Sequence, residues 1–451
     1  MFLVEVLHEF RYEFRMKRDI YEKLVAWKES PARKPLILKG ARQVGKTFIL
    51  NEFGKREFDH VAYFNFEEDP ALGEFFTGRL LPERIIEKLS IYQEAPITPD
   101  RTLIIFDEIQ NSPAALTSFK YFYEKSPEYH LAAAGSLLGI KIGQSAAFPV
   151  GKVNFIDLYP LTFGEFLDAV GKLQLRQLLK AKIEATPIAD IFHTELIDLL
   201  KIYYFVGGMP EAVNQYAADK DLNQVRKIQK EILTAFNIDF SKYTTKTEAI
   251  RIAAAWNTIP GQLAKENKKF TYAEITKYAR AREYSEAIQW LVDAGLVIKV
   301  PNIQTPKLPL SAYKKDKFKL YLCDIGMLGA MINVSQRSIV LGNRQFSEYN
   351  GAFVENYAAQ EIVAQGLSEL YYWTSKNIAE VDFVVSWQDW IFPLEVKAGV
   401  SKQKKSLRVF GQKYKPAVLS RATLMNFKED GGIRNYPLYA LFKFPHLKSV
   451  P

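Results

Sequence analysis

The order of apolar and polar residues predicts an α/β protein whose first half contains strands buried in a parallel sheet. Short apolar runs occur in "PLILKG", "HVAYFNFEE", "RTLIIFDEIQN" and "YHLAAAGS". Apolar runs of about four to eight residues are typical of strands that are covered on both faces. The first run is followed by a glycine loop and a helix start, which is the order found in α/β sheets.

The middle of the chain has a different period. From "GEFLDAVGKLQLRQLLKAKIEA" to "AIRIAAAWNTIPGQL", apolar residues recur at three- and four-residue spacing, which predicts helices. "YYFVGGMPEAV" interrupts them with Gly207, Gly208 and Pro210 and marks a turn between domains. We find no catalytic group of residues in this region.

Residues 260–325 follow the order helix, helix, helix, strand, strand. "TYAEITKYA" predicts a short helix, "YSEAIQWLVDAGLV" an amphipathic one, and "IKVPNI" with "KFKLYLCD" a β-wing. This resembles a winged helix-turn-helix, which can bind DNA or serve as a protein-interaction module. For DNA, the wing lysines are the expected phosphate partners: Lys314, Lys315, Lys317 and Lys319.

Near the C-terminus, "IAEVDFVVSWQDWIFPLEVKAG" predicts two strands joined by a polar turn. Side chains alternate along a strand, so Glu380 and Asp382 share one face, as do Glu395 and Lys397. The preceding "GAFVENYAAQEIVAQ" predicts a helix that brings Glu355 to the same place. The group would hold a divalent metal or form a solvated salt-bridge ladder.

Composition limits the function classes. The 451 residues include a single cysteine, Cys323, which excludes an intramolecular disulfide and favours a reducing, cytoplasmic setting. No apolar run approaches the ~18 residues of a membrane span. Residues 1–15 look unlike a signal peptide and are expected to be an appended or disordered leader.

The net charge of +9 lies in the C-terminal half. Residues 261–330 contain 12 Lys and Arg against 7 Asp and Glu, and residues 341–451 contain 14 against 10. Basic side chains gain free energy by releasing counterions from phosphates, so this distribution favours a DNA partner. The alternative is that the charge serves solubility.

The strongest chemical signal is a phosphate-binding loop that follows the first strand. Its pattern predicts binding of ATP with Mg²⁺. Backbone N–H groups and a helix N-terminus would bind the phosphates, Lys46 would reach the β- and γ-phosphates, and Thr47 would ligate Mg²⁺. The loop consists of Gly40, Ala41, Arg42, Gln43, Val44, Gly45, Lys46 and Thr47.

Two acids at the end of "RTLIIFDEIQN" complete this prediction. Asp107 would hold the Mg²⁺ shell, and Glu108 would orient and polarise the attacking water. An inserted strand and an acid after the Mg²⁺ aspartate are typical of the hydrolytic, AAA-like branch of P-loop proteins. Ser136 ends the next strand, where it would either sense the γ-phosphate or cap a helix.

With these motifs the chain resembles the bacterial and archaeal AAA-type ATPases that carry a C-terminal restriction-endonuclease-like domain of unknown function. The resemblance rests on "GARQVGKT", "IIFDEIQ", "AAGS", "YPLTFGEF", "YFVGGMPEAV", "KFKLYLCDIGML", "GAFVENYAAQEI" and the C-terminal hairpin. One departure is Gly151-Lys152, where the family usually has Gly-Arg. Lysine cannot copy a guanidinium, so a conventional arginine-finger ring is not expected. The departure suggests either slow turnover or a finger supplied from elsewhere, such as Arg42, and it leaves an oligomer open.

The resemblance also assigns roles in the C-terminal domain. It implies that Asp382 and Glu395 bind Mg²⁺, that Glu355 supports the site and that Lys397 positions or activates water. The basic stretch "SKQKKSLRVFGQKYK" would follow the DNA backbone.

We therefore expect a P-loop AAA-like domain at 16–165, a helical linker at 166–259, a winged helix at 260–330 and a restriction-endonuclease-like domain at 340–451. Such a protein would be an ATPase that acts on or near DNA and cleaves it under ATP control. The alternative is a regulatory switch whose C-terminal domains only bind DNA or a protein.

Overall fold

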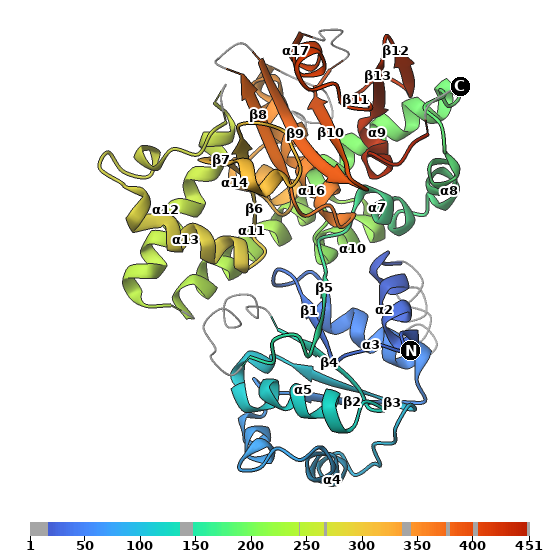
Figure 1. The fold of residues 1–451 in the computed structure, drawn as a ribbon, viewed down its shortest axis with the longest axis vertical. Helices are drawn as coiled ribbons and strands as arrows, with labels where there is room; N and C mark the ends of the chain where they lie inside the picture. The colour runs from blue at the N-terminus through green and yellow to red at the C-terminus, as the bar shows by residue number, and fades with distance from the viewer. Residues whose placement is uncertain are drawn as a thin grey trace. The chain divides into compact units, whose positions relative to one another are not determined.

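The computed structural model describes residues 17–135, 148–242, 244–265, 268–335, 344–375, 379–399 and 405–448. They form two compact units (Figure 1). The N-terminal unit comprises Lys17–Tyr159 with Asp293–Gly295, and the C-terminal unit comprises Pro160–Val292 and Leu296–Pro451. The expected leader, 1–15, and Ser136 lie outside the described residues.

The N-terminal unit is built on a five-stranded parallel sheet in the order β2-β3-β4-β1-β5. Its strands are β1 (Leu36–Lys39), β2 (His60–Asn65), β3 (Thr102–Asp107), β4 (His130–Ala134) and β5 (Asn154–Asp157). Its helices are α2 (Ile20–Glu29), α3 (Lys46–Glu57), η1 (Pro70–Phe76), α4 (Pro82–Tyr92), η2 (Ile109–Asn111) and α5 (Pro113–Lys125). The predicted α/β class with a parallel-sheet core is confirmed.

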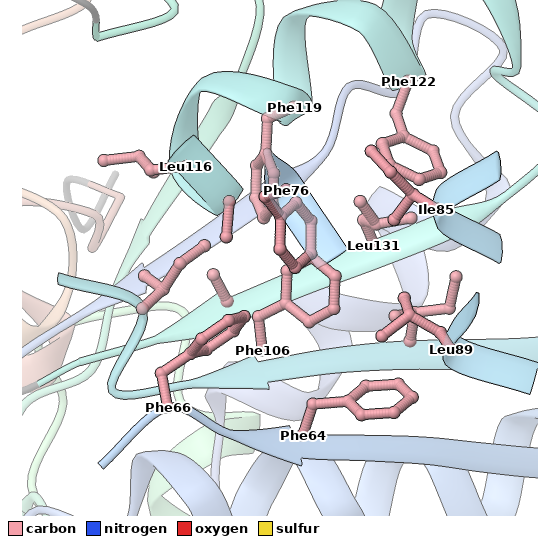
Figure 2. Close-up of a cluster of buried hydrophobic side chains, with 14 of the residues drawn as sticks. Phe64, Phe66, Phe76, Ile85, Leu89, Phe106, Leu116, Phe119, Phe122 and Leu131 are labelled. Carbon is pink, nitrogen blue, oxygen red and sulfur yellow. The ribbon is translucent and has the colours of Figure 1, made fainter. Parts of the chain in front are cut away.

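An aromatic cluster fills one face of this sheet (Figure 2). The side chain of Phe106 on β3 packs edge-to-face against those of Phe66 and Phe76, with ring centroids 5.5 and 5.6 Å apart. Helices α4 and α5 cover the cluster with Leu89 and Phe119. All six residues of β3 are buried, so the strand that carries Asp107 is firmly fixed.

The first part of the C-terminal unit is helical, as the three- and four-residue spacing predicts. It contains α7 (Phe163–Ala169), α8 (Leu173–Ala181), α9 (Asp190–Val206), α10 (Pro210–Asp219), α11 (Leu222–Lys242) and α12 (Lys246–Leu263). Later come η3 (Tyr272–Glu274), α13 (Ala281–Asp293), η4 (Leu310–Tyr313) and α14 (Ile325–Met331). The predicted helix "TYAEITKYA" is only the short turn η3, because Phe270 and Tyr272 pack on Phe318 of a neighbouring strand.

The rest of the unit is one eight-stranded sheet in the order β12-β13-β11-β10-β9-β8-β6-β7. The strands are β6 (Val297–Ile303), β7 (Lys314–Leu322), β8 (Tyr371–Ser375), β9 (Ala379–Trp387), β10 (Trp390–Val396), β11 (Leu419–Thr423), β12 (Lys428–Asp430) and β13 (Ile433–Pro437). Two helices, α16 (Arg344–Ala364) and α17 (Lys405–Tyr414), and the turn η5 (Leu438–Lys443) complete the unit.

The two strands predicted as a β-wing pair with each other in antiparallel orientation as β6–β7, but β6 also pairs in parallel with β8. The wing strands therefore extend the sheet that contains the C-terminal hairpin β9–β10. The domain boundaries at 259/260 and 330/340 stay predictions.

Candidate functional site

The glycine loop between β1 and α3 has a backbone that only glycine adopts without strain. Gly45 has a φ of 90°, in the left-handed region, directly before α3 begins. A Cβ on Gly40 would lie 2.2 Å from the carbonyl oxygen of Leu158. The loop therefore keeps its N–H groups at the start of α3, where the helix dipole favours an anion.

Lys46 is buried and bonded to its own loop. Its Nζ donates to the carbonyl oxygens of Gly40 and Ala41 at 2.9 and 2.8 Å. Burial lowers the pKa of Lys46 to about 8, although Glu108 and Asp107 raise it in part. The ammonium is thus held by neutral carbonyls, which phosphate oxygens can replace with a gain in Coulomb energy.

Asp107 lies at the carboxyl end of β3 and receives two hydroxyl groups. Thr47 Oγ1 donates to its Oδ2 at 2.7 Å, and the Tyr63 hydroxyl donates to the same oxygen at 2.8 Å. Burial, together with Asp107, raises the pKa of Tyr63, so the phenol stays protonated and remains a donor. Thr47 and Asp107 supply the oxygen ligands that Mg²⁺ prefers, so this pair fits the ion.

The strand between β1 and β3 in the sheet is β4, whereas β2 lies on the other side of β3. A strand in "HVAYFNFEE", between the loop and β3 along the chain, was predicted from the sequence, but this order in space was not. Inserting β4 separates the loop from Asp107 by one strand. The gap is bridged by the Thr47–Asp107 hydrogen bond.

Glu108 adopts a left-handed backbone, with a φ of 47°. Its N–H donates to Asp107 Oδ1 at 2.9 Å, and its carboxylate accepts a hydrogen bond from the side chain of Gln110. A non-glycine residue with a left-handed backbone is uncommon. Here it turns the chain at the end of β3, directly after Asp107.

Sequence reasoning missed several residues of this site. Besides Tyr63 and Gln110, Arg18 is buried and donates to the carbonyl oxygens of Val44 and Tyr159 at 3.1 and 2.5 Å. A conventional P-loop pattern does not include these side chains. Lys152, which stands where the family has arginine, pairs with Glu124 at 3.1 Å.

The structure also brings together the five C-terminal residues that the sequence grouped: Glu355, Glu380, Asp382, Glu395 and Lys397. Ala379 and Val381 of β9 belong to the apolar cluster beneath α17, so Asp382 faces the opposite side of the sheet. Asp382 Oδ2 accepts the N–H of Val396, next to Glu395, at 2.8 Å. Lys397 Nζ lies 3.1 Å from Glu395 Oε1.

Glu355 on α16 uses both of its oxygens. Lys268 Nζ lies 2.5 Å from Oε1, the Tyr321 hydroxyl donates to Oε2 at 2.9 Å, and Lys319 Nζ lies 3.4 Å from Oε2. Burial would raise the pKa of Glu355, but Lys319 and Lys268 lower it to about 2.

Lys319 is a correction to the sequence reading. It was expected among the phosphate-binding wing lysines, yet its side chain is 1% exposed and lies 2.7 Å from Glu380 Oε1. Burial acts to lower the pKa of Lys319, but the surrounding carboxylates raise it well above its usual value. Lys268 was likewise not among the residues predicted for this site, although it pairs with Glu355.

Asp382 and Glu395 are less fully compensated. Burial raises the pKa of Asp382 to about 7, with a further contribution from Glu355. Glu395 Oε2 is buried and has no hydrogen-bond partner among the described residues. A divalent cation would satisfy this oxygen, so the pair fits a metal through two carboxylates. Within the described ranges, no group of three or more His, Cys, Asp or Glu side chains is arranged to hold one.

Several of the phrases that carried the family resemblance meet in one buried hydrogen-bond network. Asp324 accepts the N–H of Gly208 at 2.5 Å, and the Ile325 N–H donates to Gln360 at 2.9 Å. Phe163 N–H donates to Glu361 of α16 at 2.8 Å. These phrases are therefore parts of one scaffold that holds α16 in place.

Comparison with known protein families assigns three parts of the chain. Residues 32–167 match the AAA domain family (AAA_14), residues 197–338 match a domain of unknown function (DUF8612), and residues 350–441 match a second one (DUF4143). The N-terminal unit is thus an AAA-type P-loop ATPase domain. Among curated proteins, none matches the chain.

Solved structures that resemble the chain are distant. The Walker-type ATPase PABY2304 of Pyrococcus abyssi has 12% sequence identity and a TM-score of 0.43, over 71% of this chain and 97% of that one. The ORC1 protein of Aeropyrum pernix, in complex with DNA, has 14% identity and a TM-score of 0.30, over 71% and 93%. The RuvB Holliday junction branch migration motor of Thermotoga maritima has 13% sequence identity and a TM-score of 0.31, over 64% of this chain and 90% of that one.

No described helix combines the length and the apolar character that crossing a membrane requires.

Proposed function

We propose that the N-terminal unit binds and hydrolyses ATP with Mg²⁺ and that its nucleotide state controls a C-terminal unit that acts on DNA. The observation that carries the proposal is the convergence of Lys46, Thr47 and Asp107 at the end of the parallel sheet. This edge is where α/β sheets bind their ligands. An oligomer is compatible with this scheme, but Lys152 cannot supply an arginine finger.

Each residue has a distinct task in the proposed reaction. The ammonium of Lys46 exchanges its carbonyl partners for β- and γ-phosphate oxygens, and the loop N–H groups bind the remaining phosphate charge. Bound Mg²⁺ would neutralise charge that develops on the phosphates. Glu108 orients the water that attacks the γ-phosphorus and accepts its proton. The bond between the γ-phosphorus and the oxygen that bridges it to the β-phosphate breaks, which releases ADP and inorganic phosphate.

The test separates binding from hydrolysis. We expect Lys46→Ala to abolish ATP binding measured by calorimetry, and Glu108→Gln to bind ATP as the parent does while releasing phosphate at least about a hundredfold more slowly. Lys55→Ala on the same helix and Glu128→Gln, both exposed, are matched controls. Parental hydrolysis by Glu108→Gln would refute the role given to Glu108.

A second activity, metal-dependent DNA cleavage, is favoured by the unsatisfied Glu395 Oε2 beside Asp382 and Lys397. The helix and strand order α16-β8-β9-β10-α17-β11 is also the one expected of a restriction-endonuclease-like core. In this proposal Asp382 and Glu395 hold one divalent ion, which would stabilise charge on the scissile phosphate. Lys397, whose side chain is 36% exposed, positions the hydrolytic water.

The competing proposal is a non-nucleolytic switch, which is favoured by Glu355 being fully paired with lysines. A DNA cleavage assay with Mg²⁺ or Mn²⁺, with and without ATP, distinguishes the two. Cleavage that disappears in Asp382→Asn and in Glu395→Gln supports the nuclease. DNA binding without cleavage by the intact chain supports the switch.

A further inference from the structure

Lys319 is a positive charge placed where solvent does not reach it. It lies on β7, outside the α16-to-β11 segment that contains Asp382 and Glu395. Its ammonium is 2.7 Å from Glu380 Oε1 and 3.4 Å from Glu355 Oε2, and it stands 5.1 Å from the ring centre of Tyr372. Burying an ammonium is costly unless carboxylates surround it, as they do here.

The charges at this site are distributed unevenly. Glu355 has three donors, whereas Glu395 has an oxygen without a partner among the described residues. The cationic partners of Glu355 come from β7 and from the segment after α12, and the acids left for a metal come from β9 and β10. Glu355 is therefore neutralised by two lysines, whereas Asp382 and Glu395 share a single nearby lysine, Lys397, which is 36% exposed and lies 3.1 Å from Glu395 Oε1.

We propose that Lys319 is a positioning residue of the nuclease-like site: a fixed cation that keeps Glu355 out of the metal shell and replaces a second metal ion. Asp382 and Glu395 then hold a single divalent ion. This inference rests on the proposed metal-binding function of Asp382 and Glu395.

Lys319 fits this role better than Lys268. Lys268 is 16% exposed and lies in an irregular segment, with a φ of 46°. Lys319 is 1% exposed on a paired strand and contacts two carboxylates. An ammonium a few ångströms from Glu355 stabilises the ionised carboxylate as a metal ion would. It cannot leave by diffusion.

The experiment measures Mn²⁺ binding to the full chain without nucleotide, by calorimetry and by electron paramagnetic resonance of free Mn²⁺. The variants are Lys319→Met, the charge-balanced double variant Lys319→Met/Glu355→Gln, and Asp382→Asn. Lys317→Met, an exposed lysine two residues earlier on β7, is the matched control.

We expect the parent and Lys317→Met to bind one Mn²⁺ that Asp382→Asn does not bind. Removing the ammonium should free Glu355 for the metal. Lys319→Met should therefore bind a second Mn²⁺, or bind the first at least about tenfold more tightly. The double variant, which lacks both charges, should return to parental binding.

Parental stoichiometry and affinity in Lys319→Met would overturn the inference. If Lys319→Met fails to fold in EDTA, refolding on addition of Mn²⁺ supports the inference, and no refolding while the double variant folds overturns it. The proposed metal function is tested separately by the parent and Asp382→Asn. Equal Mn²⁺ binding by these two proteins refutes that function whatever Lys319→Met does.

Discussion

The ATPase site and the proposed metal site of the C-terminal unit each place a buried lysine near carboxylates, but the two lysines have different hydrogen-bond partners. Lys46 donates to two neutral carbonyls of its own loop. Lys319 instead lies against the carboxylates of Glu355 and Glu380, and Lys268 against Glu355. Asp107 in turn receives neutral hydroxyls.

Within the described ranges, the ammonium of Lys46 therefore has no carboxylate as a hydrogen-bond partner, whereas the ammonium of Lys319 is already paired with two carboxylates. Lys46 loses its hydration on burial, and its neutral hydrogen-bond partners, with Glu108 and Asp107 nearby, offset this loss only in part. A polyphosphate is therefore attracted strongly. Carboxylate partners satisfy the ammonium permanently. We therefore expect the charge balance around Lys46 to depend on a bound nucleotide, and the charge balance around Lys319 to depend on the protein's own carboxylates.

The largest effect should come from breaking a charged pair in the C-terminal unit. We expect Glu355→Gln to destabilise this unit by about 3–5 kcal/mol, because the buried Lys319 and the partly exposed Lys268 lose a shared counter-charge. Five of the six tryptophans lie in this unit, so tryptophan fluorescence during urea unfolding measures the effect.

Glu286→Gln on α13, an exposed position, is the control for this substitution. A loss below about 1 kcal/mol in Glu355→Gln would show that the lysines are not held by charge, and the contrast between the sites would fail.

An intermediate effect concerns pH, which should act on the two units in opposite directions. Burial and Arg33 lower the pKa of His130 on β4 to about 4, so its contribution to stability is present above the usual pKa near 6.5 and is lost as the pH falls toward 4. Burial raises the pKa of Asp324 to about 6, so its contribution is present below about 3.8 and is lost as the pH rises through 6.

Each effect should reach about 2 kcal/mol. Hydrogen exchange of the amides of β4 and α14 between pH 4 and 7, corrected for intrinsic rates, measures both. The variants His130→Gln and Asp324→Asn should flatten the corresponding profile only. A common slope that survives in both variants would contradict the assignment.

The smallest effect should come from a neutral donor in the ATPase site. Tyr63→Phe removes one hydroxyl from Asp107 but leaves Thr47 in place. We expect a loss of about 1–2 kcal/mol in stability of the N-terminal unit, measured by hydrogen exchange of β3, with ATP still bound. A loss as large as that of Glu355→Gln would erase the distinction between neutral and charged pairing.

Most of the ATPase site was predictable from sequence, because its residues lie in two short segments with recognisable patterns. A strand, a glycine loop and a helix start carry Lys46 and Thr47 within one short segment, and Asp107 ends a second apolar run. The position of β4 between them was not predictable, since strand order in a sheet leaves no mark in local periodicity. Nor were Tyr63 and Arg18, which act through contacts distant in sequence.

In the C-terminal unit, alternation correctly grouped Glu380 with Asp382 and Glu395 with Lys397. Alternation could not show that "KFKLYLCD" joins the same sheet and buries Lys319. Lys319 follows several exposed lysines, and such a lysine-rich segment looks like a solvated wing. Lys268 was missed for a related reason. Lys268 lies 87 residues before its partner Glu355, so no local pattern links the two.

The segment that follows the N-terminal unit, from Pro160 to Phe163, is held by hydrogen bonds to the C-terminal unit. Leu161 donates its N–H to Gly208 at 2.7 Å and accepts the Tyr203 hydroxyl at 2.5 Å, and Phe163 donates to Glu361 of α16 at 2.8 Å. Glu361 and Glu355 lie on the same helix, fewer than two turns apart. A displacement of the chain at Pro160 would therefore reach α16 directly, through the hydrogen bond between Phe163 and Glu361.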